Sequence, residues 1–248
     1  MTGMDDFDFG SGFGFTGATI DDLGATEYTL ATIVFDESGS VGGFEKQIKD
    51  MLDTVVDACR KSPRSNNLLL RVARFSTSYR GSNGVDELHG FKPLQDINTL
   101  DYANIRGGGG TPLNDAVYSG VGATNAYGKS LADMDFLVNG ITFIITDGEE
   151  NCSTATTNMV RQELKQSVTG EILESHLSVL IGIDTGYGSS KNTLQQYQQD
   201  TGIDEFIYAG DATPGKLAKL AQFVSQSISL TSQALGTGGP SQQISTTI

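Results

Sequence analysis

Three side chains with oxygen atoms are spaced two residues apart, directly after an apolar run. The run Thr29–Phe35 leads into the segment FDESGS, which places Asp36, Ser38 and Ser40 at alternate positions. In extended backbone, alternate side chains point to the same side. One carboxylate and two hydroxyls therefore face a common point, and the glycines that follow allow the chain to turn sharply into its next element.

A second group of acidic residues follows another apolar run, ITFIIT. Asp147 comes directly after this run, and Glu149 and Glu150 follow it. If the two runs are neighbouring parallel strands, Asp147 lies at the same sheet edge as Asp36. With Glu37, the two loops would gather five acidic side chains, and a bound cation would offset their mutual repulsion. The sequence therefore predicts a cation site.

A threonine hydroxyl is the third candidate contributor. Thr111 follows four glycines in IRGGGGTPL and precedes Pro112, a residue type common at the first position of a helix. Taken alone, a threonine at this place is more often a helix N-cap whose hydroxyl is occupied by backbone amides. A role as a ligand depends on its lying close to the two aspartates.

These three motifs together resemble the metal-ion-dependent adhesion site of von Willebrand factor A domains. The resemblance rests on the segments VFDESGS, GGGGTPL and IITDGEEN, and it covers roughly residues 28–233. It implies that Ser38 and Ser40 bind the metal directly and that Thr111 does so when a ligand is engaged. Asp36 and Asp147 are implied to act partly through bound water.

The resemblance also implies a cofactor and a partner. Oxygen ligands supplemented by water suit Mg2+, with Mn2+ as a ready substitute and Ca2+ as an open alternative. In the family, the cation binds an Asp or Glu carboxylate of another protein, so we expect a protein-binding module and no enzyme. The motifs are closest to those of intracellular bacterial and viral members, whose partners include AAA+ ATPases and components of larger assemblies. The family's threonine loop moves on ligand binding, and the four glycines fit either such a movement or a slack loop.

Two alternatives from other classes stay open. In haloacid dehalogenase-type phosphatases an Asp at a strand end is the nucleophile and Mg2+ assists, which would give that role to Asp36. Those enzymes carry a second Asp two residues on, where this chain has Ser38, and no suitable Lys follows an apolar strand. The other alternative keeps the fold, makes the metal structural, and assigns the interaction to the terminal arms.

Charge and hydropathy limit the partners and the location. Thirty acidic and sixteen basic residues give a formal net charge of −14, which opposes binding to nucleic acid or to anionic membrane surfaces. No run reaches the roughly 20 apolar residues of a membrane span. The segment MTGMDDFDFG has acidic residues where a signal peptide has Lys or Arg, so we expect an intracellular protein, cytoplasmic or part of a virion.

The remaining residues that could carry chemistry favour structural roles. His89 and His176 stand singly, without a recognisable Cys or Ser nucleophile nearby in the sequence. Cys59 falls about four turns into its expected helix, roughly 20 Å from the strand-end edge where Cys152 is expected. A disulfide between the two is therefore not expected.

The elements that must position the site alternate along the chain. Short apolar runs rich in β-branched residues predict buried strands at Thr29–Phe35, Leu68–Phe75, Ile141–Ile145, Leu177–Ile183 and, more weakly, Asp204–Ala209. A strand at Val85–Phe91 is expected to pair antiparallel with Leu68–Phe75. Helices are expected over 44–60, 112–123, 156–174, 190–200 and 214–232. This order predicts an α/β, doubly wound, mostly parallel sheet with one antiparallel edge strand and helices on both faces.

The chain divides into one domain and two terminal segments. Residues 1–25 are rich in Gly, Phe and Asp without a clear period, and they are expected to be a flexible arm. Residues 26–235 form the expected domain, and residues 236–248 resemble a polar tail.

Overall fold

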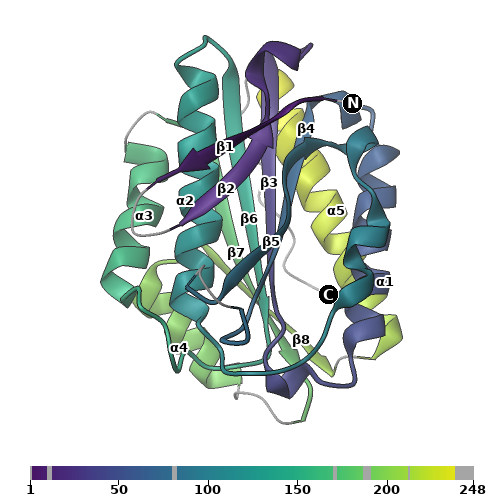
Figure 1. Cartoon of the computed structure of the whole chain (residues 1–248), viewed down its shortest axis with the longest axis vertical. Coiled ribbons are helices and arrows are strands. Elements are labelled where there is room, and N and C mark those ends of the chain that lie inside the picture. The colour runs from purple at the N-terminus through teal and green to yellow at the C-terminus, as the bar shows by residue number, and fades with distance from the viewer. Residues whose placement is uncertain are drawn as a thin grey trace.

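One mixed sheet runs through the centre of the protein (Figure 1). The computed structural model describes residues 2–9, 13–79, 83–169, 172–186, 191–211 and 213–237. Within these ranges eight strands lie in the order β1-β2-β5-β4-β3-β6-β7-β8. Their bounds are Met4–Asp8 (β1), Gly14–Ala18 (β2), Glu27–Asp36 (β3), Leu68–Phe75 (β4), Val85–Pro93 (β5), Leu137–Thr146 (β6), Ser175–Asp184 (β7) and Glu205–Asp211 (β8).

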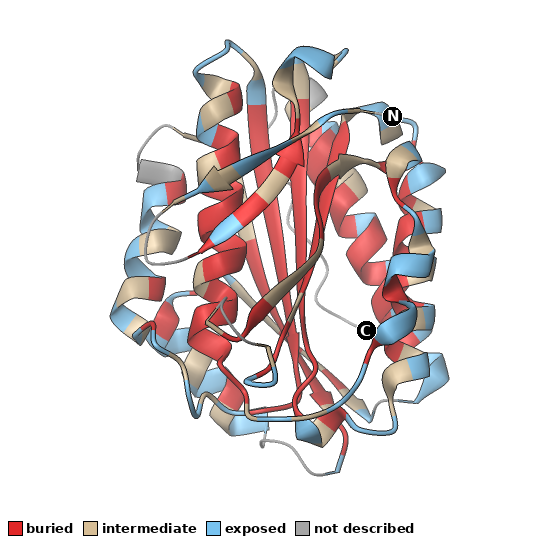
Figure 2. Ribbon diagram, viewed as in Figure 1, coloured by how far each residue is buried: buried red, intermediate tan, exposed pale blue. Residues whose placement is uncertain are grey.

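The middle of the sheet is parallel. β3 lies between β4 and β6, and β7 and β8 continue the sheet in the same direction. β5 pairs antiparallel with β4, as its position after a turn predicts. Nine consecutive residues of β3, from position 28 to 36, are buried, because helices cover both faces of the strand (Figure 2). The predicted doubly wound, mostly parallel α/β sheet is confirmed.

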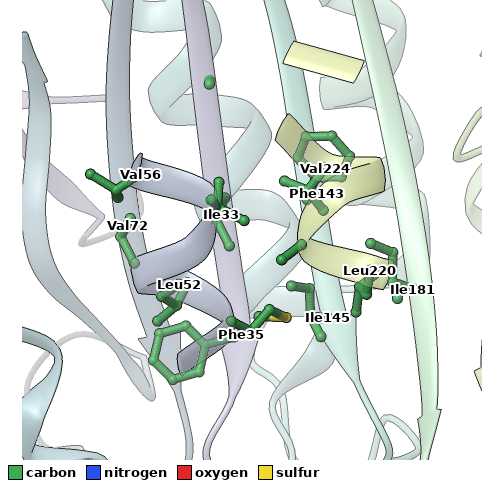
Figure 3. Close-up of a cluster of buried hydrophobic side chains, with 14 of the residues drawn as sticks. Ile33, Phe35, Leu52, Val56, Val72, Phe143, Ile145, Ile181, Leu220 and Val224 are labelled. Atoms are coloured by element: carbon green, nitrogen blue, oxygen red, sulfur yellow. The ribbon is translucent and has the colours of Figure 1, made fainter. Parts of the chain in front are cut away.

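Five α-helices in the described ranges form two layers around the sheet. α1 and α5 pack together on one face, and α2, α3 and α4 cover the other (Figure 1). Figure 3 shows α1 and α5 against the sheet, with Leu52, Val56, Leu220 and Val224 meeting apolar strand residues such as Phe143. Their bounds are Glu45–Arg60 (α1), Leu113–Ala132 (α2), Thr157–Thr169 (α3), Lys191–Thr201 (α4) and Pro214–Thr237 (α5).

Helix α2 is longer than predicted because its glycines are packing residues. The prediction ended at residue 123, whereas the helix continues to Ala132. A Cβ at Gly128, beyond the predicted end, would lie 2.4 Å from a side-chain carbon of Leu173 and 3.6 Å from one of Leu30 in β3. Gly128 therefore allows close contact between the helix and the sheet, although glycine lowers the helix propensity on which the prediction depended.

The first 25 residues differ from the flexible arm that we predicted. β1 and β2 form an antiparallel hairpin, which in Figure 1 lies over α2, and β2 extends the sheet beyond β5. Phe13 and Phe15 are each only 4% exposed. Phe15 stacks on Phe7 with a centroid distance of 5.1 Å and meets Phe91 edge-on at 6.0 Å. These alternate phenylalanines bury one side of the hairpin, a period-two pattern that the interspersed Gly and Asp obscure.

The other end of the chain is described only in part. α5 reaches Thr237, two residues into the predicted tail, and residues 238–248 lie outside the described residues. Among the described helices, none is both long and apolar enough to span a bilayer.

Candidate metal centre

Two buried carboxylates meet where adjacent parallel strands end. Asp36 ends β3 and Asp147 follows β6, and their side chains are 2% and 1% exposed. Ser40 connects the two loops, because its hydroxyl donates to Oδ1 of Asp147 at 2.6 Å. The hydroxyl oxygens of Ser38 and Ser40 are 3.1 Å apart. The structure therefore brings together the four oxygen-bearing side chains that the two strand-end motifs predicted.

Two threonines that we did not predict orient these carboxylates. The hydroxyl of Thr146 donates to Oδ2 of Asp36 at 2.5 Å, and the hydroxyl of Thr185 donates to Oδ2 of Asp147. The backbone amide of Ser38 donates to the other oxygen of Asp36 at 2.8 Å. Each carboxylate is thus fixed in one rotamer before any ligand arrives. The only signal in the sequence is the position of each threonine at the end of a buried strand.

The environment of Asp36 disfavours its charge. Burial raises the pKa of Asp36 to about 6, and the nearby carboxylate of Asp147 adds a smaller increase. Hydrogen bonds from Thr146 and Ser38 oppose this shift because they stabilise the charged form. A divalent cation beside both carboxylates would lower the pKa of Asp36, so the site is suited to holding positive charge.

Thr111 faces the same space. A Cβ at Gly148 would lie 2.9 Å from the Thr111 hydroxyl oxygen and 3.4 Å from Oδ2 of Asp36. These two oxygens therefore border a gap that exists because position 148 is glycine. The N-cap of α2 is Pro112, and no bond from the Thr111 hydroxyl to an α2 amide is found in the part of the chain that the structure describes. The capping role that we weighed for Thr111 does not hold.

Glu150 and Ser153 bond to the first amides of α2 instead. A carboxylate oxygen of Glu150 accepts from the Asn114 amide at 2.6 Å, and the hydroxyl oxygen of Ser153 accepts from the Asp115 amide at 3.1 Å. Asp115 in turn accepts from two amides of the loop that carries Glu150 and Ser153. These reciprocal hydrogen bonds fix the loop after β6 against the start of α2.

The five acidic residues of the two loops do not gather at one point, contrary to our prediction. Glu150 is occupied at the start of α2, Glu149 is exposed, and Glu37 is buried on another side of its loop. The alternation of extended backbone separates Glu37 from its neighbours Asp36 and Ser38. The repulsion that a cation must offset is therefore that of one pair, Asp36 and Asp147.

The donor set fits a hard divalent cation. In the described ranges no three His, Cys, Asp or Glu side chains come together as metal ligands, so a cation at this edge would need hydroxyl ligands as well. Two carboxylates and three hydroxyls supply oxygen ligands only, the chemistry that Mg2+, Mn2+ and Ca2+ prefer. The role as ligands of Asp36, Ser38, Ser40, Thr111 and Asp147 stays a prediction that the geometry supports.

The two histidines hydrogen-bond to groups that are not candidate metal ligands, and the two cysteines are not paired with each other. Nδ1 of His89 donates to the carbonyl of Gly90, and Nε2 accepts from the hydroxyl of Tyr102 at 2.8 Å. His176 hydrogen-bonds two hydroxyls, those of Thr142 and Ser167. Burial lowers the pKa of each imidazole to about 4. Cys59 is buried, Cys152 is exposed, and both thiols are free.

Several solved structures have the same arrangement of elements at low sequence identity. The pilus adhesin SpaC from Lactobacillus rhamnosus GG matches 92% of this chain at 12% identity with a TM-score of 0.63. A von Willebrand factor type A protein from Catenulispora acidiphila matches 87% at 13% identity with a TM-score of 0.53. Proximal thread matrix protein 1 from the mussel byssus, with a zinc-occupied MIDAS motif, matches 85% at 16% identity with a TM-score of 0.52.

The similarity covers only part of each of these three proteins. The matches cover 33%, 45% and 47% of those three chains, so this chain corresponds to less than half of each. No protein-family model matches the sequence, and no curated protein matches it. Similarity at these identities shows the fold alone. With its parallel core, its helices on both faces and its strand-end carboxylates, the chain has the von Willebrand factor A fold.

Proposed function

We propose that this protein is a metal-dependent module that binds another protein through a divalent cation held at the ends of β3 and β6. The observation that carries the proposal is the convergence of Asp36, Ser38, Ser40 and Asp147, connected by the 2.6 Å bond from Ser40 to Asp147. A mussel byssus protein of the same fold has zinc in its MIDAS motif, which supports a divalent metal here. We propose Mg2+ as the cation in this chain.

The ligand set explains why the cation would bind a carboxylate. When bound, the cation supplies positive charge and an exchangeable coordination position. Three of its ligands are neutral hydroxyls and the two aspartates act partly through water, so the cation keeps residual positive charge and an Asp or Glu side chain of a partner protein completes the site. In a chain with a net charge of −14, the cation would provide the local attraction that the surrounding surface does not. An AAA+ ATPase or a component of a larger assembly is the partner class that we propose.

The surroundings of Asp36 count against the phosphatase alternative. Both oxygens of Asp36 accept hydrogen bonds, from the Ser38 amide and from Thr146, and the side chain is 2% exposed. A nucleophilic carboxylate needs an oxygen within reach of the substrate. Ser38 also occupies the place of the second Asp that such phosphatases carry. We therefore propose a binding protein and no enzymatic step.

The N-terminal segment gives little support to interaction through the arms. The phenylalanines that could anchor a flexible arm to a partner, Phe13 and Phe15, are buried within this chain.

We also propose where in or outside the cell the protein acts. We keep the cytoplasm or a virion as the first candidate, and the pilus adhesin and byssus neighbours favour an adhesive protein outside the cell as the second.

Calorimetric titration of chelator-treated protein with Mg2+ and Mn2+ tests the proposal. We expect one-to-one binding by the wild type, increased by acetate as a stand-in for the partner carboxylate. The double variant Ser38→Ala/Ser40→Ala should lose this binding. The matched control Ser130→Ala/Ser229→Ala, which removes two hydroxyls from α2 and α5, should keep it. Absence of binding in the wild type with and without acetate would contradict the proposal.

A further inference from the structure

Glu37 is a fully buried carboxylate that lies beside the metal centre without facing it. Its exposed fraction is 0%, although it sits between two candidate ligands in the sequence. Its carboxylate accepts hydrogen bonds from the hydroxyl of Tyr79 and from the backbone amide of Arg106. A guanidinium nitrogen of Arg74 lies 3.4 Å from it. Burying a charge is costly unless it is paired and hydrogen-bonded, and here it is both.

Arg74 also bonds to the start of the loop that contains Arg106, residues 104–110. Its Nη1 donates to the carbonyl of Asn104 at 2.8 Å, and its Nε donates to Asp86 at 2.8 Å. Its guanidinium carbon lies 4.7 Å from the ring centre of Tyr79. Burial raises the pKa of Tyr79, and the hydrogen bond to Glu37 and its charge raise it further. Tyr79 therefore keeps its proton at neutral pH and remains a donor to Glu37.

The glycine loop between Arg106 and Thr111 is held from both sides. The amide of Gly108 donates to the backbone carbonyl of Glu37 at 3.0 Å, and the amide of Gly39 donates to the carbonyl of Gly109 at 3.0 Å. On the other side, the amide of Gly110 donates to the hydroxyl of Thr77 at 2.7 Å. The loop leads directly into Thr111, so these bonds set the place of the threonine together with its own two hydrogen bonds to Asn151.

The conformation of the loop depends on glycine as well as on these bonds. Gly109 has a φ of +78°, a region that residues with a Cβ rarely adopt. A Cβ there would meet the hydroxyl oxygens of Ser76, Thr77 and Ser78 at 2.6 to 2.8 Å. Four glycines without side chains to pack would otherwise make a slack loop. Its bonds to Glu37, Gly39 and Thr77 replace that missing packing.

We propose that Glu37 is a positioning residue for the metal centre: it clamps the 104–110 loop against the Asp36–Ser40 loop and holds Thr111 in place before cation or partner arrives. A loop clamped in this way does not have to move for the site to be complete. The part of the proposal that concerns metal affinity rests on the proposed function, whereas the clamping itself does not.

Hydrogen exchange in the absence of metal tests the clamp. In Glu37→Gln, we expect the amides of Arg106, Gly108 and Gly110 to exchange about tenfold faster, with core amides of β6 unchanged. The matched control is Glu87→Gln, which alters another carboxylate bonded to an arginine, with bonds to Arg71 and Thr16 in place of residues of this loop. It should leave exchange in the 106–110 segment within about twofold of the wild type.

Calorimetry with Mg2+ and acetate tests the consequence for the site. Glu37→Gln should weaken Mg2+ binding about tenfold, and Glu87→Gln should not weaken it. If Glu37→Gln does not fold, Tyr79→Phe removes one donor to the same carboxylate and should produce the same local acceleration to a smaller degree.

The outcomes separate this proposal from the proposed function. Unchanged exchange in the loop, or equal acceleration in loop and β6, would overturn the clamp. Local acceleration with undiminished Mg2+ affinity would overturn its link to the metal centre. Local acceleration in Glu37→Gln together with a wild type that binds no Mg2+ would contradict the proposed function and leave the clamp standing.

Discussion

The N-terminal hairpin, β1 and β2, and the loops around the proposed metal site are both rich in glycine and acidic residues, but different interactions hold them in place. We call the sheet edge with these loops, at the ends of β3 and β6, the metal edge. The hairpin is fixed mainly by aromatic rings, with Phe15 among Phe7, Phe91 and Tyr127. The loops at the metal edge are fixed by side-chain oxygens that accept from backbone amides, as Glu37 and Glu150 do. Apolar burial tolerates small adjustments, whereas a buried polar network is costly when one member is left unpaired.

Because of this difference, we expect the hairpin to affect mainly the stability of the protein and the polar loops to affect mainly its metal binding. The hairpin can contribute several kcal/mol to folding through area removed from water and still leave the metal edge unchanged, because no metal-site residue lies in it. The polar loops contribute less net stability for each bond. What they provide is a fixed geometry, which is what a cation with directional ligands requires.

The largest expected effect belongs to the hairpin. Phe15→Ala removes a ring that is 4% exposed, and loss of such a side chain costs about 3–5 kcal/mol of unfolding free energy. Chemical denaturation would measure this loss. Mg2+ affinity should stay within about twofold, because Phe15 contacts α2 at Tyr127 whereas the loop after β6 bonds to the start of that helix. A large loss of Mg2+ affinity in the folded variant would break the separation between the two regions.

A pH effect is expected at β5, the strand that the hairpin adjoins. His89 has its pKa lowered from 6.5 to about 4 by burial, so below pH 6.5 the unfolded chain binds a proton that the folded chain does not. The stability that neutral His89 contributes is complete above pH 6.5 and is lost progressively as pH falls to about 4. One pKa unit corresponds to about 1.4 kcal/mol, so this loss is about 3 kcal/mol.

Denaturation at a series of pH values, compared between wild type and His89→Gln, isolates this contribution. The variant has no imidazole to protonate, so its stability should fall less steeply between pH 6.5 and 4. Equal slopes would contradict the assignment. Mg2+ affinity of His89→Gln at pH 7 should match that of the wild type, since the imidazole bonds Gly90 and Tyr102.

A smaller effect, with opposite signs for stability and binding, is expected at the metal edge. Asp36→Asn removes one of two buried carboxylates and should stabilise the metal-free protein by about 1–2 kcal/mol at pH 7. The same change should abolish the stabilisation that Mg2+ gives the wild type. Thermal unfolding with and without Mg2+ would show both effects. Destabilisation of metal-free Asp36→Asn would mean that the hydrogen bonds of Asp36 outweigh its burial and its repulsion by Asp147.

The two regions also differ in how far the sequence predicts them. Long apolar runs such as Leu177–Ile183 predict buried strands correctly, because a strand covered on both faces needs apolar residues at nearly every position. The convergence of Asp36 and Asp147 follows from the same argument, since parallel strands end at one edge. The hairpin was missed because Phe7 and Phe15 are separated by polar and glycine residues that weaken the period-two signal.

The hydrogen-bond partners of the polar side chains at the metal site could not be predicted from the sequence, for a different reason. Glu37, Glu149 and Glu150 look equivalent in the sequence, yet only the backbone path decides that one clamps a loop, one is exposed and one bonds to α2. Thr146 and Thr185 are typical of strands in composition. Their hydrogen bonds to the two aspartates depend on rotamers that the strand pattern does not specify.

The smallest effect that we expect is also the most specific test of that polar edge. Thr185→Val keeps the shape of the side chain but removes the hydroxyl that donates to Oδ2 of Asp147. Because loss of such an outer partner lowers metal affinity about tenfold, calorimetry with Mg2+ should show that decrease. Thr185→Ser restores the donor and should recover most of the affinity. If Thr185→Val binds Mg2+ as tightly as Thr185→Ser, Asp147 is held well enough by Ser40 alone, and the metal edge depends less on its polar partners than the comparison with the hairpin indicates.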